Sequence, residues 1–423
     1  MPDSRFITES APDGRTPSQR DRDRILYASH FSRLAEITQV VSPERGYVYH
    51  NRLTHSLKVG QIARRIAEKC IREYPATVWG DALPDPDAAE AAGLAHDLGH
   101  PPFGHVAEDE LDTLVRKEGL DDGYEGNAQS FRIATRLAAS DARDAEALPV
   151  RGLNLTRRTL DGILKYPWPH GANPGKPKKW GYYRTESEMF HWVRRQRKDH
   201  QRSLIAEIMD WADDITFAIH DLNDFYCAGR IPIDRCKNEA SKELQRLADG
   251  MFNRRQDWLQ EKSLYDDALR DIVSIFPFEA DERYADSPTD RANLHAFSSG
   301  LIGYFVNAFS LQFERAEPIV SIESSARREV EVLKQFIWEY VIENPELAVT
   351  QNGQRTAIRT VFGELMGAVK QRKFHLLPGA YTQDLKDAAS DELRIRIVAD
   401  CVSGMTEREL LDFYRRLSGF SGD

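Results

Sequence analysis

The sequence predicts an all-α fold, and three observations indicate it. Apolar residues recur at steps of three and four over long segments, stretches with strand-like alternation are scarce, and no repeat of solenoid length is visible. The clearest segment is residues 54–74, where one apolar stripe contains Val59, Ile62, Ala63, Ile66 and Cys70. We therefore expect a helix there and a helical core around it.

Two further segments carry the same period. Residues 203–222 repeat it through Leu204, Ile208, Ala212, Ile215, Ile219 and Leu222, and residues 326–342 through Val330, Leu333, Ile337 and Tyr340. Residues 141–154 and 167–183 break the helical pattern and are predicted loops. Proline and acidic residues at 277–290 suggest a boundary. We expect a flexible tail over 1–20, a main domain over 21–275 and a C-terminal helical lobe over 276–423.

Composition is that of a soluble globular protein, with 423 residues, 41% hydrophobic and 29% charged. The net charge of -10 gives no general attraction to nucleic acid or anionic membranes, so a polyanionic substrate would need a local basic cluster. Four cysteines without a C-x-x-C pair and an N-terminus without a signal sequence favour a reducing cytoplasm. The uncharged run 292–313 contains too many polar residues for a membrane span and is expected to be a buried helix.

The densest group of chemically active side chains is HDLGHPPFGHVAE, residues 96–108. A helix over 88–95 would deliver His96 and Asp97 together at its end, while His55 opens another helix and Asp213-Asp214 lies inside a third. Two imidazoles and two carboxylates suit a divalent metal ion, either Mg, Mn or another transition metal. Each residue alone would more often be structural; the combination favours a metal site.

His105 and Glu108 are three residues apart, which places them on one face if a helix starts near His105. Such a pair can move a proton near neutral pH, although Glu108 could also be an ordinary first-turn helix charge. His100 precedes the Pro-Pro turn and is as easily structural, so we leave it out of the predicted site. We interpret as structural the histidines that lack a surrounding motif, which are His170, His191, His200, His220, His295 and His375.

The order H…HD…D resembles the HD superfamily of phosphohydrolases, and the chain from about residue 20 onward resembles the bacterial deoxyguanosine triphosphate triphosphohydrolase family. The matching pieces are RDRDRI (20–25), FSRL (31–34), TQV (38–40), RLTHSL (52–57), residues 96–108, YEGNAQS (124–130), LNLT (153–156), TLDGILKYP (159–167), ADDI (212–215) and SGMT (403–406). The resemblance implies an HD-type helical core and hydrolysis of a deoxynucleoside triphosphate (dNTP) to a deoxynucleoside and tripolyphosphate.

The resemblance also assigns roles to individual residues. The positions that match the family's metal ligands are His55, His96, Asp97 and Asp213, and the catalytic pair matches His105 and Glu108. Asp213 is preferred over Asp214 because Phe217 and Asp221 follow it at the family's steps of four. The family pattern usually has Tyr where this chain has Phe217, so the hydroxyl that could hydrogen-bond the sugar or a phosphate is missing. Many relatives have Arg where this chain has Ser32.

Substrate contacts are implied at five more positions. Arg52 matches an arginine that contacts phosphate, and Gln39 matches a residue that faces the sugar and base. Lys165, Tyr166 and Lys179 match triphosphate and sugar contacts, and Phe217 and Asp221 complete the set. Lys176, Lys178 and Lys179 also form the local basic cluster that a triphosphate requires, although a solvated run of charge explains these lysines equally well.

Two alternatives remain open. An HD phosphodiesterase or nucleotidase would use the same metal ligands, and a nucleotide-sensing module could hydrolyse nucleotide only incidentally. The resemblance further implies a homo-oligomer, either a hexamer or a tetramer, and a possible nucleotide or single-stranded DNA effector, but no membrane.

Overall fold

The computed structural model describes residues 1–8, 13–39, 51–79, 82–139, 152–195, 197, 200–238, 240–279, 284–313 and 318–419. Its architecture is all-α, as predicted, with one short two-stranded sheet among these residues. Strand β1 (Phe309–Gln312) pairs antiparallel with β2 (Ile319–Ile322), with Phe309 opposite Ile322.

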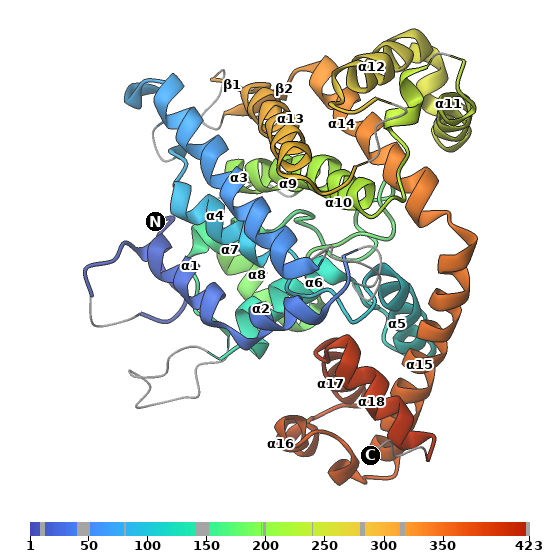
Figure 1. Ribbon diagram of the computed structural model, residues 1–423. Helices are drawn as coiled ribbons and strands as arrows, with labels where there is room; N and C mark the ends of the chain where they lie inside the picture. Colours follow the sequence, from blue (N-terminus) through green and yellow to red (C-terminus); the bar gives the residue numbers. More distant parts are fainter. Residues whose placement is uncertain are drawn as a thin grey trace.

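The helices follow one another along the chain (Figure 1). The first nine are α1 (Pro17–Tyr27), α2 (Ser29–Arg33), α3 (Arg52–Glu73), α4 (Pro86–Ala95), α5 (His105–Lys117), α6 (Gly126–Arg132), α7 (Arg157–Ile163), α8 (Ser187–Val193) and α9 (Leu204–Thr216). The others are α10 (Leu222–Cys227), α11 (Lys242–Arg254), α12 (Lys262–Ile275), α13 (Pro288–Asn307), α14 (Ser324–Ile337), α15 (Pro345–Lys370), α16 (Gly379–Asp387), α17 (Asp391–Ser403) and α18 (Glu407–Leu417). In the described part of the chain, π-helical turns lie at Ile133–Leu137, Phe217–Asp221 and Trp338–Ile342.

The larger hydrophobic cluster surrounds α3, α4 and α9, which pack on one another. Close approach of α3 and α4 depends on two glycines, because a Cβ built on Gly93 would lie 2.8 Å from the Cα of Gly60. Side-chain caps fix where these helices begin. The Oδ1 atom of Asn51 accepts the Thr54 amide at the start of α3, and the Ser203 hydroxyl accepts the Ala206 amide at the start of α9.

The smaller cluster combines α5 with α15, α16, α17 and α18. In Figure 1, α15 runs down one side of the molecule, beside α5, to the C-terminal helices. The two clusters therefore do not follow the proposed boundary at 275/276, because α5 shares a core with the C-terminal helices and α11–α14 share one with α3. The boundary itself stays a prediction.

The predicted helices over 54–74, 203–222 and 326–342 are present, with the last two ending in π-helical turns. Residues 167–183 form no helix, as expected, and most of the predicted loop 141–154 lies outside the described residues. The run 292–313 is corrected in two ways. Only one face of α13 is buried, through residues such as Leu294 and Leu301, and the run ends in β1.

The predicted flexible tail is also corrected where the structure describes it. Helix α1 begins at Pro17, inside the proposed tail, and Arg5 Nη1 lies 2.6 Å from the fully buried Asp21 Oδ1. An ion pair at a buried carboxylate holds this segment against the domain. Among the described residues, no helix is both long and apolar enough to span a bilayer.

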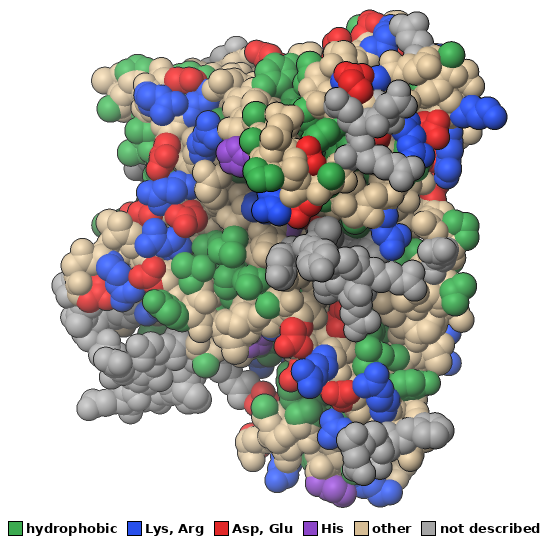
Figure 2. Space-filling model, in the orientation of Figure 1, with side chains coloured by type: hydrophobic (Ala, Val, Ile, Leu, Met, Phe, Trp, Pro, Cys, Tyr) green, Lys and Arg blue, Asp and Glu red, His purple; other side chains and the backbone are tan. Residues whose placement is uncertain are grey.

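Figure 2 shows basic and acidic side chains lying next to one another over much of one face.

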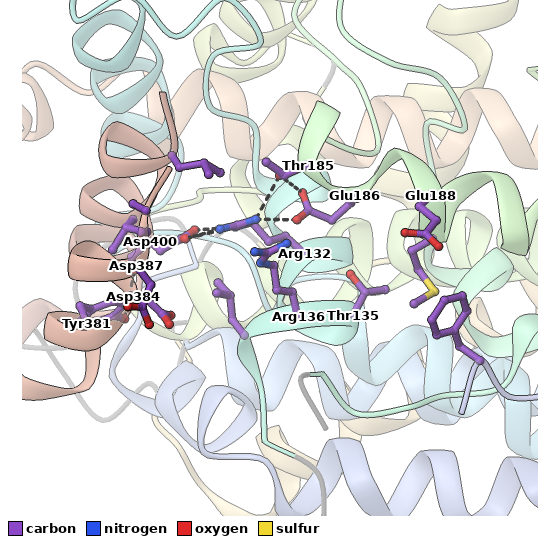
Figure 3. Close-up of a pocket in the computed structure, with 16 residues that line it drawn as sticks. Arg132, Thr135, Arg136, Thr185, Glu186, Glu188, Tyr381, Asp384, Asp387 and Asp400 are labelled. Atoms are coloured by element: carbon purple, nitrogen blue, oxygen red, sulfur yellow. Dashed lines mark hydrogen bonds and ion pairs between the residues drawn. The ribbon is translucent and has the colours of Figure 1, made fainter. Parts of the chain in front are cut away.

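The region shown in Figure 3 joins the C-terminal helices to the rest of the molecule. Here the buried Arg132 guanidinium of α6 binds Asp400 of α17 at 2.7 Å and Glu186 at 2.5 Å. Charge-assisted bonds on both sides of one guanidinium fix α17 against α6.

Candidate active site

Three of the four predicted metal ligands, His55, His96 and Asp213, converge in the structure, and the fourth, Asp97, lies beside His96. The Nε2 atom of His55 lies 3.1 Å from Asp213 Oδ1, and His96 Nε2 lies 3.7 Å from the same oxygen. His96 Nε2 is also 3.4 Å from Asp97 Oδ1. Ligand bonds of about 2.0–2.2 Å place neighbouring ligand atoms roughly 3 to 4 Å apart, so this spacing fits a divalent metal ion.

The tautomer of His96 favours the same interpretation. Its Nδ1 donates to the Gly93 carbonyl at 2.6 Å, which leaves the lone pair on Nε2. This Nε2 is buried and has no hydrogen-bond partner among the described residues. A buried imidazole nitrogen with a free lone pair, directed at two carboxylates, is the donor that a metal ion would satisfy.

The geometry of the structure also favours Asp213 over Asp214 as the metal ligand. Both lie near the end of α9, but the Asp214 carboxylate pairs with Lys334 of α14, away from the two histidines. The second oxygen of Asp213 accepts from Lys165 Nζ at 2.8 Å. The second oxygen of Asp97 accepts from Arg52 Nη1 at 2.6 Å. Each carboxylate is thus held by a cation on its outer oxygen.

These contacts set the ionisation of the site. Burial alone would lower the pKa of His55, but the carboxylates of Asp213 and Asp221 raise it to about 10. Burial opposes the charge on Asp97, yet His100, His96 and Arg52 keep its pKa well below the usual range. The carboxylates of Asp97 and Asp213 therefore stay ionised, and His55 must release its proton before it can bind a metal ion.

The sequence predicted that Asp213, Phe217 and Asp221 lie on one continuous α-helix, but the structure has a break between them. Helix α9 ends at Thr216 and a π-helical turn covers Phe217–Asp221. Asp221 nevertheless reaches the site, because its Oδ1 lies 3.8 Å from His55 Nδ1. Phe217 is half-buried against the larger hydrophobic cluster. Single π-helical turns of this kind occur frequently at functional sites.

The predicted catalytic pair occupies the first turn of α5. His105 Nδ1 donates to Glu108 Oε2 at 2.8 Å, and the His105 side chain is 70% exposed while that of Glu108 is 9% exposed. The other oxygen of Glu108 accepts from the Gly126 amide and from Lys179 Nζ, at 3.2 and 3.1 Å. Burial opposes charge on Glu108, but His105 and Lys179 keep its pKa well below the usual range. An oriented imidazole with one exposed face can exchange a proton with a substrate.

His100 is the main site residue that the sequence prediction left out. It is buried between the two groups, with Nδ1 3.0 Å from Asp97 Oδ1 and its ring 5.3 Å, centre to centre, from the ring of His105. Burial and the nearby Arg52 lower the pKa of His100 to about 4. A neutral imidazole therefore separates the predicted metal ligands from the predicted catalytic pair. The feature of the sequence that could have identified His100 as a site residue was its position inside the block of residues 96–108.

The other predicted substrate contacts divide into two groups. Lys165 and Arg52 lie beside the metal ligands, whereas Lys179 lies beside Glu108 and Glu125. Tyr166 is half-buried next to Trp168. Lys176 Nζ stands 5.2 Å from the centre of the Tyr166 ring, while the side chain of Lys178 is exposed to solvent. The basic run at 176–179 is therefore partly a solvated charge and partly a lining of the site.

Gln39 lies at the edge of the described residues, directly after Thr38. It is half-buried, and the structure records no hydrogen-bond partner for its buried Oε1. Thr38 forms a single antiparallel bridge with Asn51, the residue that precedes Arg52. The segment that presents Gln39 is therefore attached to the start of α3.

Comparison with known proteins agrees with this geometry. A family model described as the HD domain matches residues 52–218, and one described as a phosphohydrolase-associated domain matches residues 320–416. Deoxyguanosinetriphosphate triphosphohydrolase-like proteins from Corynebacterium efficiens and Streptomyces coelicolor are each 35% identical to this chain. The alignments cover 100% and 96% of this chain, and 96% and 93% of those proteins. A protein of the same name from Shewanella pealeana is 31% identical over 93% of this chain and 90% of its own length. The chain therefore belongs to the deoxyguanosinetriphosphate triphosphohydrolase-like family of HD-domain proteins and is a metal-dependent phosphohydrolase.

Proposed function

We propose that this protein hydrolyses deoxynucleoside triphosphates at the α-phosphate, releasing a deoxynucleoside and inorganic tripolyphosphate. The observation that carries the proposal is the juxtaposition of a four-residue metal-ligand set with the His105–Glu108 pair, joined through His100. One part can activate a phosphate for attack and the other can supply a proton. The names of the relatives support the choice of substrate class.

In the proposed reaction, water adds to the α-phosphorus and the bond from phosphorus to the sugar oxygen breaks. The water gives up one proton to solvent, which restores the proton that His105 supplies to the sugar oxygen. The leaving alkoxide is a poor leaving group and must be protonated as it departs. His105 is the proton donor, and Glu108 holds the His105 ring through Nδ1, which leaves Nε2 to face the substrate. A divalent metal ion held by His55, His96, Asp97 and Asp213 would supply Lewis-acid polarisation of the phosphate.

Positive groups beside both parts of the site support a triphosphate substrate. Lys165 and Arg52 are bound to the outer oxygens of two metal-ligand carboxylates, and Lys179 is bound to Glu108. On a chain of net charge -10, these residues concentrate positive charge where the phosphates would lie. Gln39, Tyr166, Phe217 and Asp221 are proposed to contact the sugar and base.

A product assay tests the proposal directly. The protein would be incubated with each of the four dNTPs and four ribonucleoside triphosphates, with Mg²⁺ or Mn²⁺, and the products separated by ion-exchange chromatography. We expect nucleoside and tripolyphosphate in equal amounts from at least one dNTP. Nucleoside monophosphate with pyrophosphate would contradict cleavage at the sugar oxygen.

The two alternatives predict different products. An HD phosphodiesterase would cleave a bis-p-nitrophenyl phosphate ester rapidly and release tripolyphosphate from no dNTP. A sensing module would bind a dNTP but turn it over so slowly that His105→Ala would not change the rate. Leu164–Pro167 and Gly404–Thr406, which match the triphosphohydrolase family, favour the proposed function over a phosphodiesterase. The presence of all six predicted metal-ligand and catalytic residues weighs against a sensing module.

We further propose that the protein acts as a homo-oligomer, a hexamer or a tetramer, in the cytoplasm, and that a nucleotide or single-stranded DNA can act as effector. A monomer at all concentrations in light scattering would contradict the first point. Equal rates with and without single-stranded DNA or a second dNTP would contradict the effector.

A further inference from the structure

Glu407 lies far from the HD domain in sequence but contacts it directly. It is the first residue of α18, and its carboxylate accepts three hydrogen bonds from two other segments. Oε1 accepts from the Thr38 amide at 2.7 Å and from the Phe103 amide at 3.1 Å, while Oε2 accepts from the Thr38 hydroxyl at 2.9 Å. One side chain therefore holds together residues 38, 103 and 407.

The bond to Thr38 acts on the part of the site that is proposed to face the nucleoside. Thr38 precedes Gln39 and forms the bridge to Asn51. In addition, the Ile37 carbonyl accepts the amide of Arg52 at 3.0 Å. A displacement of Thr38 would therefore move Gln39 and disturb the first turn of α3.

The bond to Phe103 acts on the catalytic pair. Phe103 and Gly104 both have positive φ, 68° and 58°, and Gly104 is the N-cap residue of α5, with His105 at the first helical position. A non-glycine residue with positive φ is strained and persists only when its surroundings hold it in place. Phe103 also has its side chain in the smaller hydrophobic cluster, so Glu407 and this core hold the turn together.

The C-terminal segment that presents Glu407 is itself firmly attached. The buried Arg33 Nη1 donates to the carbonyls of Ser403 and Met405, at 3.0 and 3.1 Å, and its Nη2 donates to those of Leu98 and His100, at 2.9 and 2.7 Å. Arg132 binds Asp400 in the same helix region (Figure 3). Two buried guanidinium groups thus anchor the support from which Glu407 reaches the site.

We propose that Glu407 is a positioning residue for the active site, which sets the place of the His105 turn and of the Gln39 segment at the same time. It touches neither metal ligand nor substrate and acts through Phe103 and Thr38. The proposal rests on the proposed function, and it assigns to the C-terminal helices a role in forming the active site. It implies that the loss of the carboxylate lowers kcat through His105 and raises KM through Gln39.

The test compares two variants of equal length. Glu407→Gln keeps an oxygen that can accept both amides, and its NH₂ group can donate to the Thr38 hydroxyl. Glu407→Met keeps the approximate length but has no such acceptor. With the preferred dNTP and Mn²⁺, we expect Glu407→Gln to stay within about threefold of wild type and Glu407→Met to lose about 10- to 100-fold in kcat/KM, the cost of a small misplacement of catalytic groups. Metal content, measured on the purified proteins, should be unchanged in both.

Glu409 provides the matched control, because it lies in the same first turn and its carboxylate accepts the Thr406 amide at 2.8 Å. Glu409→Met weakens the cap of α18 without touching Thr38 or Phe103 and should leave kcat/KM near wild type. The same loss in Glu409→Met as in Glu407→Met would overturn the proposal, because helix destabilisation would then explain both. Equal activity of Glu407→Met and Glu407→Gln would also overturn it.

A double variant locates the effect. In a His105→Ala background, Glu407→Met should cause no further loss of kcat but should still raise KM, since only the Gln39 segment remains to be displaced. An undiminished further loss of kcat would contradict action through His105.

Amide hydrogen exchange separates this proposal from the proposed function. The Thr38 and Phe103 amides should exchange faster in Glu407→Met than in Glu409→Met, whether or not any dNTP is hydrolysed. Unchanged protection of both amides would overturn the positioning role, whereas a wild-type protein that releases no tripolyphosphate would overturn the proposed function alone.

Discussion

At the scale of single residues, His105 and Glu108 have opposite environments although one hydrogen bond joins them. The Glu108 carboxylate is buried and receives three donors, while the His105 ring projects into solvent. Such an arrangement suits a fixed carboxylate that orients a mobile proton carrier. It also means that His105 can be altered without disturbing a buried contact other than its bond to Glu108.

Replacement of His105 by Ala should lower kcat by about 10²- to 10⁴-fold, the range ordinarily supplied by general acid catalysis. Because His105 is exposed and outside the metal-ligand set, the thermal midpoint and the metal content should not change. Steady-state kinetics, thermal denaturation and elemental analysis of the same preparation measure these three quantities. Loss of the metal in this variant would place His105 among the ligands instead of in the proton-transfer role.

At the scale of elements, the distance between α3 and α4 decides whether His55 and His96 meet. A Cβ on Gly93 would approach Gly60 to 2.8 Å, and the adjacent Val59 carbonyl carbon to 3.1 Å. Both contacts are with backbone atoms, which cannot move as an isolated side chain can. The two helices would have to separate.

We therefore expect Gly93→Ala to lower the free energy of unfolding by about 1–3 kcal/mol, through overpacking, and to weaken Mn²⁺ binding. Gly303→Ala in α13 is the matched control, because the position is helical and a Cβ there meets no atom within 4 Å. That change should be neutral or stabilising by up to about 1 kcal/mol. Chemical denaturation and metal titration measure both effects. A Gly93→Ala protein as stable as Gly303→Ala would contradict the packing argument.

The sequence predicts some structural elements of this protein and not others. The apolar period identified α3, α9 and α14 because each buries one continuous stripe. Of the four residues that the HD pattern identified, three converge in space and Asp97 lies beside His96. The π-helical turn at Phe217–Asp221 could not be predicted, because a single inserted residue leaves the local pattern almost unchanged. The contacts of Arg33 and Glu407 join segments more than 300 residues apart, and no local spacing encodes them.

At the scale of the whole molecule, the candidate site lies where the two hydrophobic clusters meet. The proposed metal ligands come from helices α3 and α9 and from the end of α4, in the larger cluster, whereas His105 and Glu108 belong to α5, in the smaller one. The two parts of the site are therefore held by different cores. Contacts across that junction, including those of Glu407 and Arg33, set their relative position.

Acid should destabilise the folded molecule before it affects the carboxylates of the active site. Burial and the neighbouring Arg33 lower the pKa of His30 to about 4, and burial and Lys58 lower that of His220 to about 4. Free histidine titrates near 6.5, so the unfolded chain binds more protons between pH 6.5 and 4. Stability from these residues is complete above pH 6.5 and is lost as the pH falls towards 4.

Replacing His30 by Gln should therefore reduce the dependence of the unfolding free energy on pH by up to about 1.4 kcal/mol per pH unit between pH 4.5 and 6. Urea denaturation at several pH values measures this slope. The same substitution at the exposed His295 is the control and should leave the slope unchanged. A slope as steep in His30→Gln as in wild type would show that other groups cause the acid sensitivity.

Metal removal should affect the whole molecule, because the four proposed ligands come from three helices of one core. A ligand that binds only the folded chain raises its stability by RT ln(1 + [L]/Kd), about 2.7 kcal/mol at 100 times Kd. Chelation should lower the thermal midpoint by several degrees, and Mn²⁺ should restore it. Asp213→Asn should lose this response, while Asp214→Asn, whose carboxylate pairs with Lys334 outside the ligand set, should keep it. A gain in stability that is equal in both Asp variants would mean that the ion binds elsewhere.

The effect of the metal ion should also depend on pH, because His55 must release its proton before it can bind metal. The increase in thermal midpoint caused by a fixed Mn²⁺ concentration should therefore grow as the pH rises from 6.5 to 9.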